Sequence, residues 1–193
     1  IFRGIECIGM DLNPETKNKA IANLKHIKGK NFKVILGNSS KIDKYFSRNS
    51  IDCVASEPYM GPYFKSYPRK EEAIKITKEL NELYENFFVN LKKVIKKNGR
   101  VAMVLPVIKA SNRKKYRLNL DKIFRKSGFK IVKLDDIEFP LVYQEKKSII
   151  EREIYVLEWF IYFYWLLIYM KTMPISWISS YLYCKRKLYL EKS

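Results

Sequence analysis

Short apolar runs alternate with stretches of helical periodicity over the first 158 residues, a pattern typical of α/β folds. The apolar runs predict strands at Ile5–Leu12, Phe32–Gly37, Ile51–Ala55, Arg100–Pro106, Phe129–Leu134 and Ile149–Leu157. Helices are predicted after Pro14, at Glu71–Lys97 and at Leu118–Ser127. We therefore expect a doubly wound, mostly parallel sheet that ends in an antiparallel pair at one edge. Residues 141–145 are expected to be a connector between the last two strands.

Residues that favour helix ends support these boundaries. Asn13 is a good N-cap and Pro14 suits the first helical position, so a helix is expected to begin here. Gly29, Gly99 and Gly128 follow the three helical stretches and are expected to end them. The long second helix has one apolar face, which we expect to pack into the core. It comprises Leu80, Leu83, Tyr84, Phe87, Phe88, Leu91, Val94 and Ile95.

The apolar run Ile51–Ala55 is followed closely by Glu57, Pro58 and Tyr59. In open α/β sheets, ligands bind beyond the carboxyl ends of the strands. Pro58 has a fixed φ and biases Glu57 away from helix, so this turn is expected to be rigid. It would present one acceptor and one aromatic ring at a fixed angle. The alternative is an ordinary turn that happens to contain a glutamate.

Two other predicted strands also end in polar residues. Asp11 lies at the end of the first, and Asn38 and Ser39 follow the second. A carboxylate in this position can accept hydrogen bonds from both hydroxyls of a ribose, and an amide can both donate and accept. The alternatives are a helix-capping turn at Asp11 and a simple polar turn at Asn38.

The chain is strongly basic. Its 193 residues include 38 Lys and Arg against 20 Asp and Glu, which gives a net charge of +18. Such a charge favours a polyanionic partner, either nucleic acid or an anionic membrane surface, although a lysine-rich surface alone would also explain it. Half of the excess falls between Lys109 and Lys133, where ten basic residues accompany one acid, Asp121. Its first part is expected to be a loop beyond the strand that neighbours the Glu57 strand. A solvated basic helix face is the alternative.

Few residues of this chain are suited to metal binding or nucleophilic catalysis. Cys7, Cys53 and Cys184 are far apart and form no Cys-x-x-Cys pair, so reduced thiols and a cytoplasmic location are expected. The one histidine, His26, is expected on a helix surface. A Ser-His-Asp triad and a histidine-based metal site are therefore not supported, and we expect no metal.

The segment Ser56–Gly61 resembles a variant of the Asp/Asn-Pro-Pro-Tyr motif of Rossmann-like S-adenosylmethionine-dependent amino-methyltransferases. It is most similar to the form found in the THUMP-associated tRNA guanosine-N2 methyltransferases. Glu57 replaces the usual Asp or Asn, and one proline is missing. Two further stretches resemble this family: Gly9–Pro14, where the acid holds the ribose of the cofactor, and Arg152–Ile154, in the final strand.

This resemblance implies methyl transfer from S-adenosylmethionine to an exocyclic amine of a base, with guanine N2 in tRNA as the first expectation. Glu57 and the Pro58 carbonyl would accept the amine hydrogens, and Tyr59 would stack on the base. The cofactor would be bound by Asp11, Leu12, Asn38 and Ser39. The phosphate backbone of the RNA would be bound by Lys109, Arg113, Lys114, Lys115 and Arg117.

The glycine-rich loop that such folds place after their first strand is absent from this sequence. None of the seven glycines forms a Gly-x-Gly-x-x-Gly pattern. The first strand and this loop are therefore expected upstream of Ile1, so that residues 1–158 would be an N-terminally incomplete catalytic domain, poor in cofactor binding or inactive as it stands.

Residues 159–193 depart from the family pattern and are expected to form an apolar extension. The run Trp159–Met170 has no charge and seven aromatic residues. Twelve helical residues span about 18 Å, which is short of the roughly 30 Å apolar slab of a bilayer. The run could lie at a membrane interface, cover a partner, pack on the sheet edge or be an unnatural extension.

Two other functions remain open at this stage. The same motif class serves DNA adenine-N6 and cytosine-N4 methylation. A non-catalytic, basic module that binds RNA or a membrane surface would explain the missing glycine loop, the missing proline and the aromatic tail.

Overall fold

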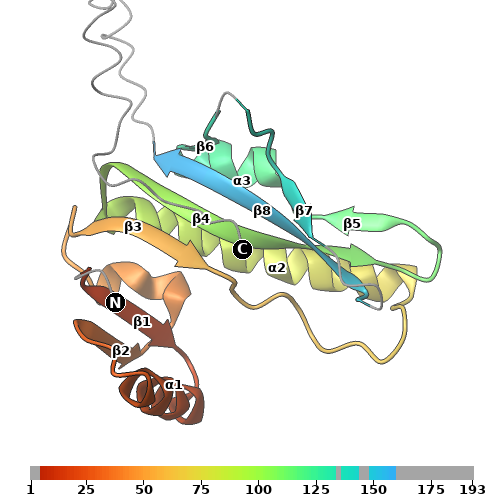
Figure 1. Ribbon diagram of the computed structural model, residues 1–193. Helices are drawn as coiled ribbons and strands as arrows, with labels where there is room; N and C mark the ends of the chain where they lie inside the picture. The colour runs from red at the N-terminus through yellow and green to blue at the C-terminus, as the bar shows by residue number, and fades with distance from the viewer. Residues whose placement is uncertain (1–4, 134–135, 144–147, 160–193) are drawn as a thin grey trace, which may run out of the picture. The chain divides into compact units, whose positions relative to one another are not determined.

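The computed structural model describes residues 5–133, 136–143 and 148–159, and it has an α/β fold with two sheets (Figure 1). A two-stranded parallel sheet pairs β1 (Cys7–Asp11) with β2 (Phe32–Leu36). The second sheet has the strand order β3–β4–β8–β6. These strands are β3 (Ile51–Ser56), β4 (Ile95–Lys109), β8 (Ile150–Trp159) and β6 (Phe129–Ile131). Two short strands extend it: β5 (Lys115–Arg117) pairs with β4, and β7 (Leu141–Tyr143) pairs with β8.

The larger sheet is mixed, which corrects the expectation of a mostly parallel sheet. Only β3 and β4 run parallel, as predicted for the strand next to the Glu57 strand. The predicted antiparallel pair is formed by β8 and β6, with β6 at the edge of the sheet. Strand β8 itself is not an edge strand, because it also pairs antiparallel with β4. Residues 141–143, expected to be part of a connector, form β7 on β8.

The first helix, α1 (Pro14–His26), begins where the sequence predicts. The Asn13 side chain accepts hydrogen bonds from the backbone N–H groups of Glu15 and Thr16. The left-handed position that ends the helix is occupied by Lys28, with φ of 52°, and not by Gly29 as expected. The amide of Gly29 still closes the end by donating to the Leu24 carbonyl.

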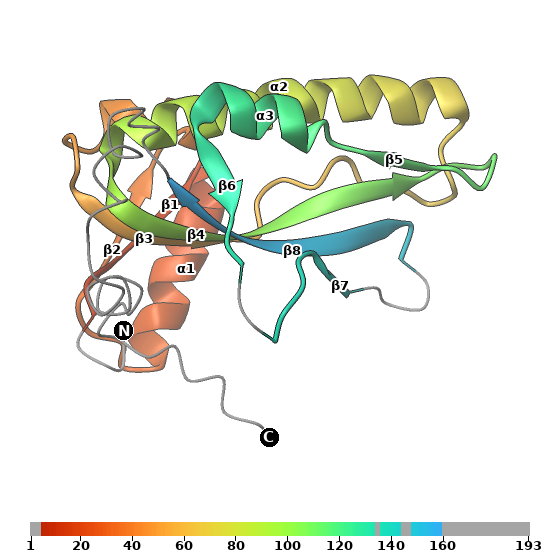
Figure 2. The same ribbon diagram turned by 90° about the horizontal axis from the view of Figure 1, so that it is seen from above.

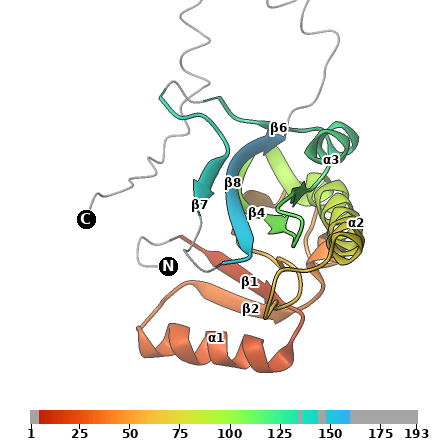
Figure 3. The same ribbon diagram turned by 90° about the vertical axis from the view of Figure 1, so that its right-hand side faces the viewer.

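The core lies between the larger sheet and two helices, α2 (Lys70–Val94) and α3 (Leu120–Ser127), which cover the same face (Figures 2 and 3). The buried positions of α2 follow the predicted apolar face. They are Ala73, Ile76, Leu80, Tyr84, Phe87, Phe88, Leu91 and Val94. Phe88 packs edge-to-face against Phe124 of α3 and Phe129 of β6. The 3-10 helix η1 (Ser39–Lys44) also packs on α2 and contributes Ile42 to the core.

The end of α2 differs from the prediction. The helix stops at Val94, and β4 begins at once with Ile95, which pairs with Ile51. Sheet pairing therefore overrides the helical spacing of Ile95. The chain turns at Asn98, whose φ is 64°. Gly99 is required here because an added Cβ would lie 2.5 Å from Ile95 Cγ1.

The predicted aromatic extension, residues 159–193, lies outside the described residues except for Trp159. Trp159 is the last residue of β8 and pairs with Phe129, and residues 160–170 lie outside the described residues. Within the part of the chain that the structure describes, no helix is long and apolar enough to cross a membrane.

Candidate functional site

The turn that follows β3 is exposed and is held from two sides. Glu57 and Tyr59 are both exposed, and Tyr59 retains 60% of its accessible surface. On the sheet side, the guanidinium Nε of Arg152 in β8 lies 2.7 Å from Glu57 Oε1. This pair spans the intervening strand β4. It fixes one carboxylate oxygen of Glu57 and leaves the other without a hydrogen bond among the described residues.

On the helix side, the turn is anchored by Tyr84 of α2. Its ring is buried, and its hydroxyl donates a hydrogen bond to the Tyr59 carbonyl at 3.1 Å and lies 4.0 Å from Met60 Sδ. Burial raises the pKa of the Tyr84 phenol above its usual value, and the nearby negative charge of Glu57 raises it further. Tyr84 therefore remains a neutral donor and fixes the turn that carries the acceptor and the ring.

A second group of polar residues lies at the carboxyl ends of β1 and β2. Asp11 Oδ1 accepts from the Asn13 amide at 2.7 Å, and the Asp11 carbonyl accepts from the Gly37 amide. Asn38 caps η1, and its Oδ1 accepts from both the amide and the hydroxyl of Ser40. Both lone pairs of this oxygen are thus used, so Asn38 can offer a ligand only its amide hydrogens. The sequence alone suggested that it could also accept.

The remaining cofactor candidates are accessible. Leu12 and Ser39 are exposed next to the two strand ends. Asp11 keeps one carboxylate oxygen free of hydrogen bonds within the described residues. The structure therefore brings these predicted residues to adjacent strand ends, because Asp11 and Leu36 are register partners in the parallel pair.

Helix α2 links this strand end to the Glu57 turn. The Asn90 side chain of α2 donates to the Ser40 carbonyl at 2.7 Å, immediately after Asn38 and Ser39. Lys93 adds an ion pair with Asp43 of η1 at 2.8 Å. Tyr84 and Asn90 are six residues apart, which corresponds to about 9 Å along the helix axis. One rigid element therefore holds both groups of candidate residues.

The predicted nucleic-acid-binding loop is a β-hairpin made by β4 and β5, and its five basic residues have two different environments. Lys109, Lys115 and Arg117 surround two buried carboxylates of β8. Lys115 Nζ lies 2.7 Å from Glu151 Oε2, and Arg117 Nε lies 2.9 Å from Glu153 Oε1. Arg113 and Lys114, at the exposed tip, make no side-chain hydrogen bond or ion pair with the described residues.

Ion pairs hold Lys109, Lys115 and Arg117, called here the inner cations, next to the two carboxylates. Burial opposes ionisation of Glu151, but the Lys115 hydrogen bond and the surrounding positive charges outweigh it and lower the pKa of this carboxyl. The hydrogen bond from Arg117 to Glu153 raises the pKa of the arginine. These three cations are therefore paired with buried acids, whereas Arg113 and Lys114 have no acidic partner among the described residues. The binding of nucleic acid by all five residues stays a prediction.

Sequence reasoning missed Arg152 and Tyr84 as functional candidates. Tyr84 was assigned only to the core face of its helix, and Arg152 only to the final strand. The one available signal was the alternation in β8, which places Arg152 on the opposite face from Glu151 and Glu153. That Arg152 meets Glu57 depends on the strand order, which the sequence does not show.

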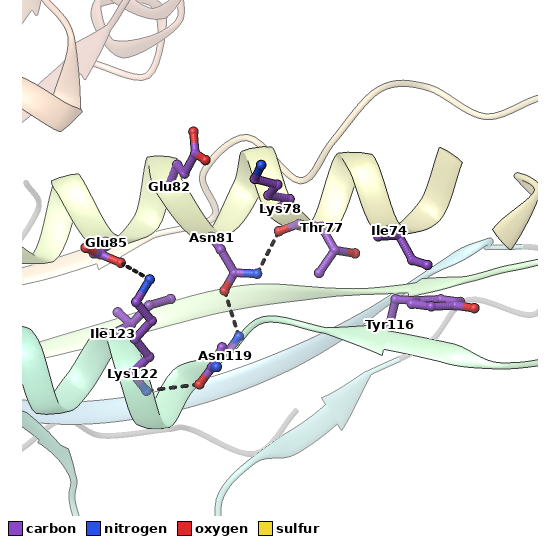
Figure 4. A pocket seen from close by; sticks show the side chains of 10 residues that line it. All are labelled: Ile74, Thr77, Lys78, Asn81, Glu82, Glu85, Tyr116, Asn119, Lys122 and Ile123. Carbon is purple, nitrogen blue, oxygen red and sulfur yellow. Dashed lines mark hydrogen bonds and ion pairs between the residues drawn. The ribbon is translucent and has the colours of Figure 1, made fainter. Parts of the chain in front are cut away.

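A shallow pocket of about 350 Å³ lies between α2 and the β5–α3 segment (Figure 4). Its polar groups are largely paired with each other. Asn81 donates to the Thr77 carbonyl and accepts from the Asn119 amide, and Glu85 is paired with Lys122 and Lys126. Glu57, Asp11 and the hairpin tip do not line it, so it is not part of the candidate site.

The comparisons with known proteins identify the fold. No family model matches the sequence, and no curated protein matches it. Among solved structures, the chain is similar to TrmN from Thermus thermophilus, with 14% identity, a TM-score of 0.54 and coverage of 80% of this chain. The chain spans 36% of the length of TrmN.

Two further solved structures lead to the same conclusion. One is a SAM-dependent methyltransferase from Methanosarcina mazei, with 11% identity, a TM-score of 0.51 and coverage of 81% of this chain and 82% of that one. The other is 1,6-didemethyltoxoflavin-N1-methyltransferase from Burkholderia thailandensis, with bound S-adenosylhomocysteine. Its identity is 12%, its TM-score 0.51, and the match covers 83% of this chain and 64% of that one. The chain therefore has an α/β fold with a mixed sheet that resembles the fold of SAM-dependent methyltransferases.

Proposed function

We propose that this chain carries the base-binding part of an S-adenosylmethionine-dependent methyltransferase that acts on an exocyclic amine in RNA, with guanine N2 in tRNA as the first candidate. The observation that carries the proposal is the exposed Glu57–Tyr59 turn at the carboxyl end of β3. Arg152 holds its carboxylate and Tyr84 holds its backbone. Residues 1–158 would form the catalytic domain of a cytoplasmic enzyme in tRNA processing, and 159–193 an extension.

The chemistry assigned to the turn follows from the weak nucleophilicity of an exocyclic amine, whose lone pair is delocalised into the ring. Two acceptors that bind its hydrogens localise the lone pair on nitrogen. Glu57 supplies a carboxylate oxygen and Pro58 a carbonyl. Tyr59, whose ring is exposed next to both, stacks on the base and sets the angle of approach.

The residues at the ends of β1 and β2 fit part of the cofactor. The free carboxylate oxygen of Asp11 suits ribose hydroxyls, the amide hydrogens of Asn38 suit ring nitrogens of adenine, and exposed Leu12 offers an apolar surface. When bound, S-adenosylmethionine supplies an electrophilic methyl group. Ser39, also exposed, is the fourth candidate contact.

The two sheets suggest where the glycine-rich loop would be added. Within the described residues, β1 pairs only with β2 along its length, and β3 pairs only with β4. Each strand therefore has an unpaired edge. One additional parallel strand bonded to both edges would join the sheets and place its following loop beside Asp11.

The test is a radiolabelled methyl-transfer assay on tRNA and on duplex DNA with the protein encoded by the complete natural gene. We expect transfer to tRNA, and loss of transfer in Glu57→Ala with RNA binding largely unchanged. Retained activity in Glu57→Ala would reject the role of this carboxylate. Transfer to duplex DNA alone would favour adenine-N6 or cytosine-N4 methylation.

A non-catalytic RNA-binding module is the second candidate. The engaged oxygen of Asn38 and the absence of a glycine-rich pattern in the sequence favour it. Isothermal titration with S-adenosylhomocysteine distinguishes the two: no binding by the protein encoded by the complete gene would support the module. Sedimentation with anionic vesicles would identify a membrane-surface role instead.

A further inference from the structure

The segment between β3 and α2, residues 57–69, has an inner and an outer side. Phe64 packs against the core, and Pro68 is buried, so these two residues anchor the segment. Tyr63 and Tyr67 face outward, with 90% and 54% of their surfaces exposed. A tyrosine that exposes 90% of its surface has almost no packing role in this chain, so its ring is available to a ligand.

This segment runs from the Glu57 turn towards the tip of the β4–β5 hairpin. Figures 1 and 2 both show the start of α2 and the hairpin at the same end of the sheet. The Ser111 amide of the hairpin donates to the Pro68 carbonyl at 2.9 Å, which joins the two segments directly. The exposed tyrosines therefore belong to a segment that leads from Glu57 to the hairpin.

The hairpin tip is rigid and cationic. Its turn is closed by hydrogen bonds from the Ala110 amide to the Lys114 carbonyl and from the Arg113 amide to the Ala110 carbonyl. The Asn112 side chain also accepts from the Lys114 amide. Arg113 and Lys114 are exposed and, unlike the inner cations, have no acidic partner among the described residues.

The two segments are predominantly basic, and the nearest acids in the sequence are Glu71 and Glu72 in the first turn of α2. Residues 57–69 contain one acid, Glu57, and two further cations, Lys65 and Arg69, both exposed. Residues 109–117 contain no acid. Stacking rings that alternate with cations suit a strand with free bases and phosphates. A duplex has its base faces stacked on each other and could use only the cations.

We propose that Tyr63, Tyr67, Arg113 and Lys114 form a track that binds an unpaired stretch of RNA and leads one end of it to the Glu57 turn. The tyrosines stack on bases, and the tip cations bind phosphates. This inference deepens the proposed function and rests on it only for the base that reaches Glu57. The binding surface itself does not depend on methyl transfer.

The test measures fluorescence anisotropy of a single-stranded oligoribonucleotide of about 12 nucleotides, within the site sizes of single-strand binders, and of the same strand in a duplex. We expect tighter binding of the single strand by the full chain. Tyr63→Leu is expected to weaken it about 5-fold or more, whereas Tyr63→Phe, which keeps the ring, should bind like the wild type. Arg113→Gln should reduce the slope of log K against log salt by about 0.7.

Ser66→Ala is the matched control, because Ser66 is exposed in the same segment but has no ring. Circular dichroism should show that every variant is folded, since Tyr63 is almost fully exposed. Wild-type affinity in Tyr63→Leu, or equal affinity for duplex and single strand, would overturn the track. Single-strand binding without any methyl transfer would refute the proposed function and leave the track intact.

Discussion

The same substitution at two adjacent hairpin lysines should affect two different properties, the stability of the protein at Lys115 and RNA binding at Lys114. Lys115 makes hydrogen bonds of 2.7 and 3.0 Å to the buried Glu151 carboxylate, whereas Lys114 at the exposed tip has no partner among the described residues. Changing each to methionine removes the charge and keeps the apolar stem. The ion pair therefore predicts lower stability in Lys115→Met, and the proposed RNA track predicts weaker RNA binding in Lys114→Met.

The magnitude for Lys115→Met follows from its contacts. A hydrogen bond to a charged group contributes about 1.5–3 kcal/mol to stability. The lower end of this range applies here because the Lys115 side chain is 42% exposed. In addition, Lys109 and Arg117 remain near Glu151 after the substitution. A loss of about 1.5 kcal/mol lowers Tm by about 3–6 °C in a chain of this size. Lys114→Met should change stability by less than about 0.5 kcal/mol.

The stability difference should also depend on pH. The positive charges lower the pKa of Glu151 in the folded chain, so its ion pairs contribute fully above the usual glutamate pKa of about 4.3. That contribution is lost as the pH falls through the lower, folded-state pKa. We therefore expect the Tm difference between wild type and Lys115→Met to be largest near neutral pH and to shrink under acidic conditions.

Thermal unfolding followed by circular dichroism, and salt titrations of RNA binding, measure the two effects. Lys114→Met should reduce the salt slope by about 0.7, and Lys115→Met should leave it unchanged. The reasoning fails if Lys115→Met keeps the wild-type Tm and loses RNA affinity. That result would mean that Lys115 leaves Glu151 to bind phosphate.

Two further predictions concern the supports of the Glu57 turn. Arg152 has interactions besides its pair with Glu57, so the pair is measured by a double-mutant cycle of Arg152→Gln and Glu57→Gln. Urea unfolding should give a coupling free energy of about 0.2–1 kcal/mol, as for other partly exposed pairs. Zero coupling would show that the two side chains do not interact in solution. Tyr84→Phe removes the hydrogen bond to the turn at a cost of about 0.5–1.5 kcal/mol and should raise the KM for RNA more than it lowers kcat, because the acceptors remain but are less well positioned. An unchanged KM with a lowered kcat would instead place Tyr84 in the chemical step.

Local signals in the sequence were sufficient for most of the elements. Asn13 predicted the start of α1, Gly128 the end of α3, and the apolar face of α2 its buried side. Apart from the end of α1, the errors fall where pairing with a distant segment overrode local preference. Ile95 left the helix to pair with Ile51, and residues 141–143 became a strand because β8 offered a free edge.

What the sequence determined by itself is the identity of the elements and of the polar residues at the strand ends, because caps, periodicity and turn residues act within a few positions of the chain. Only the tertiary structure decided which charges are available. Glu151 and Lys115 are 36 positions apart, and Glu57 and Arg152 are 95 apart. Strand order brings each pair together. Cations that lie next to a buried carboxylate stabilise the sheet, and cations without such a partner remain available to bind another molecule.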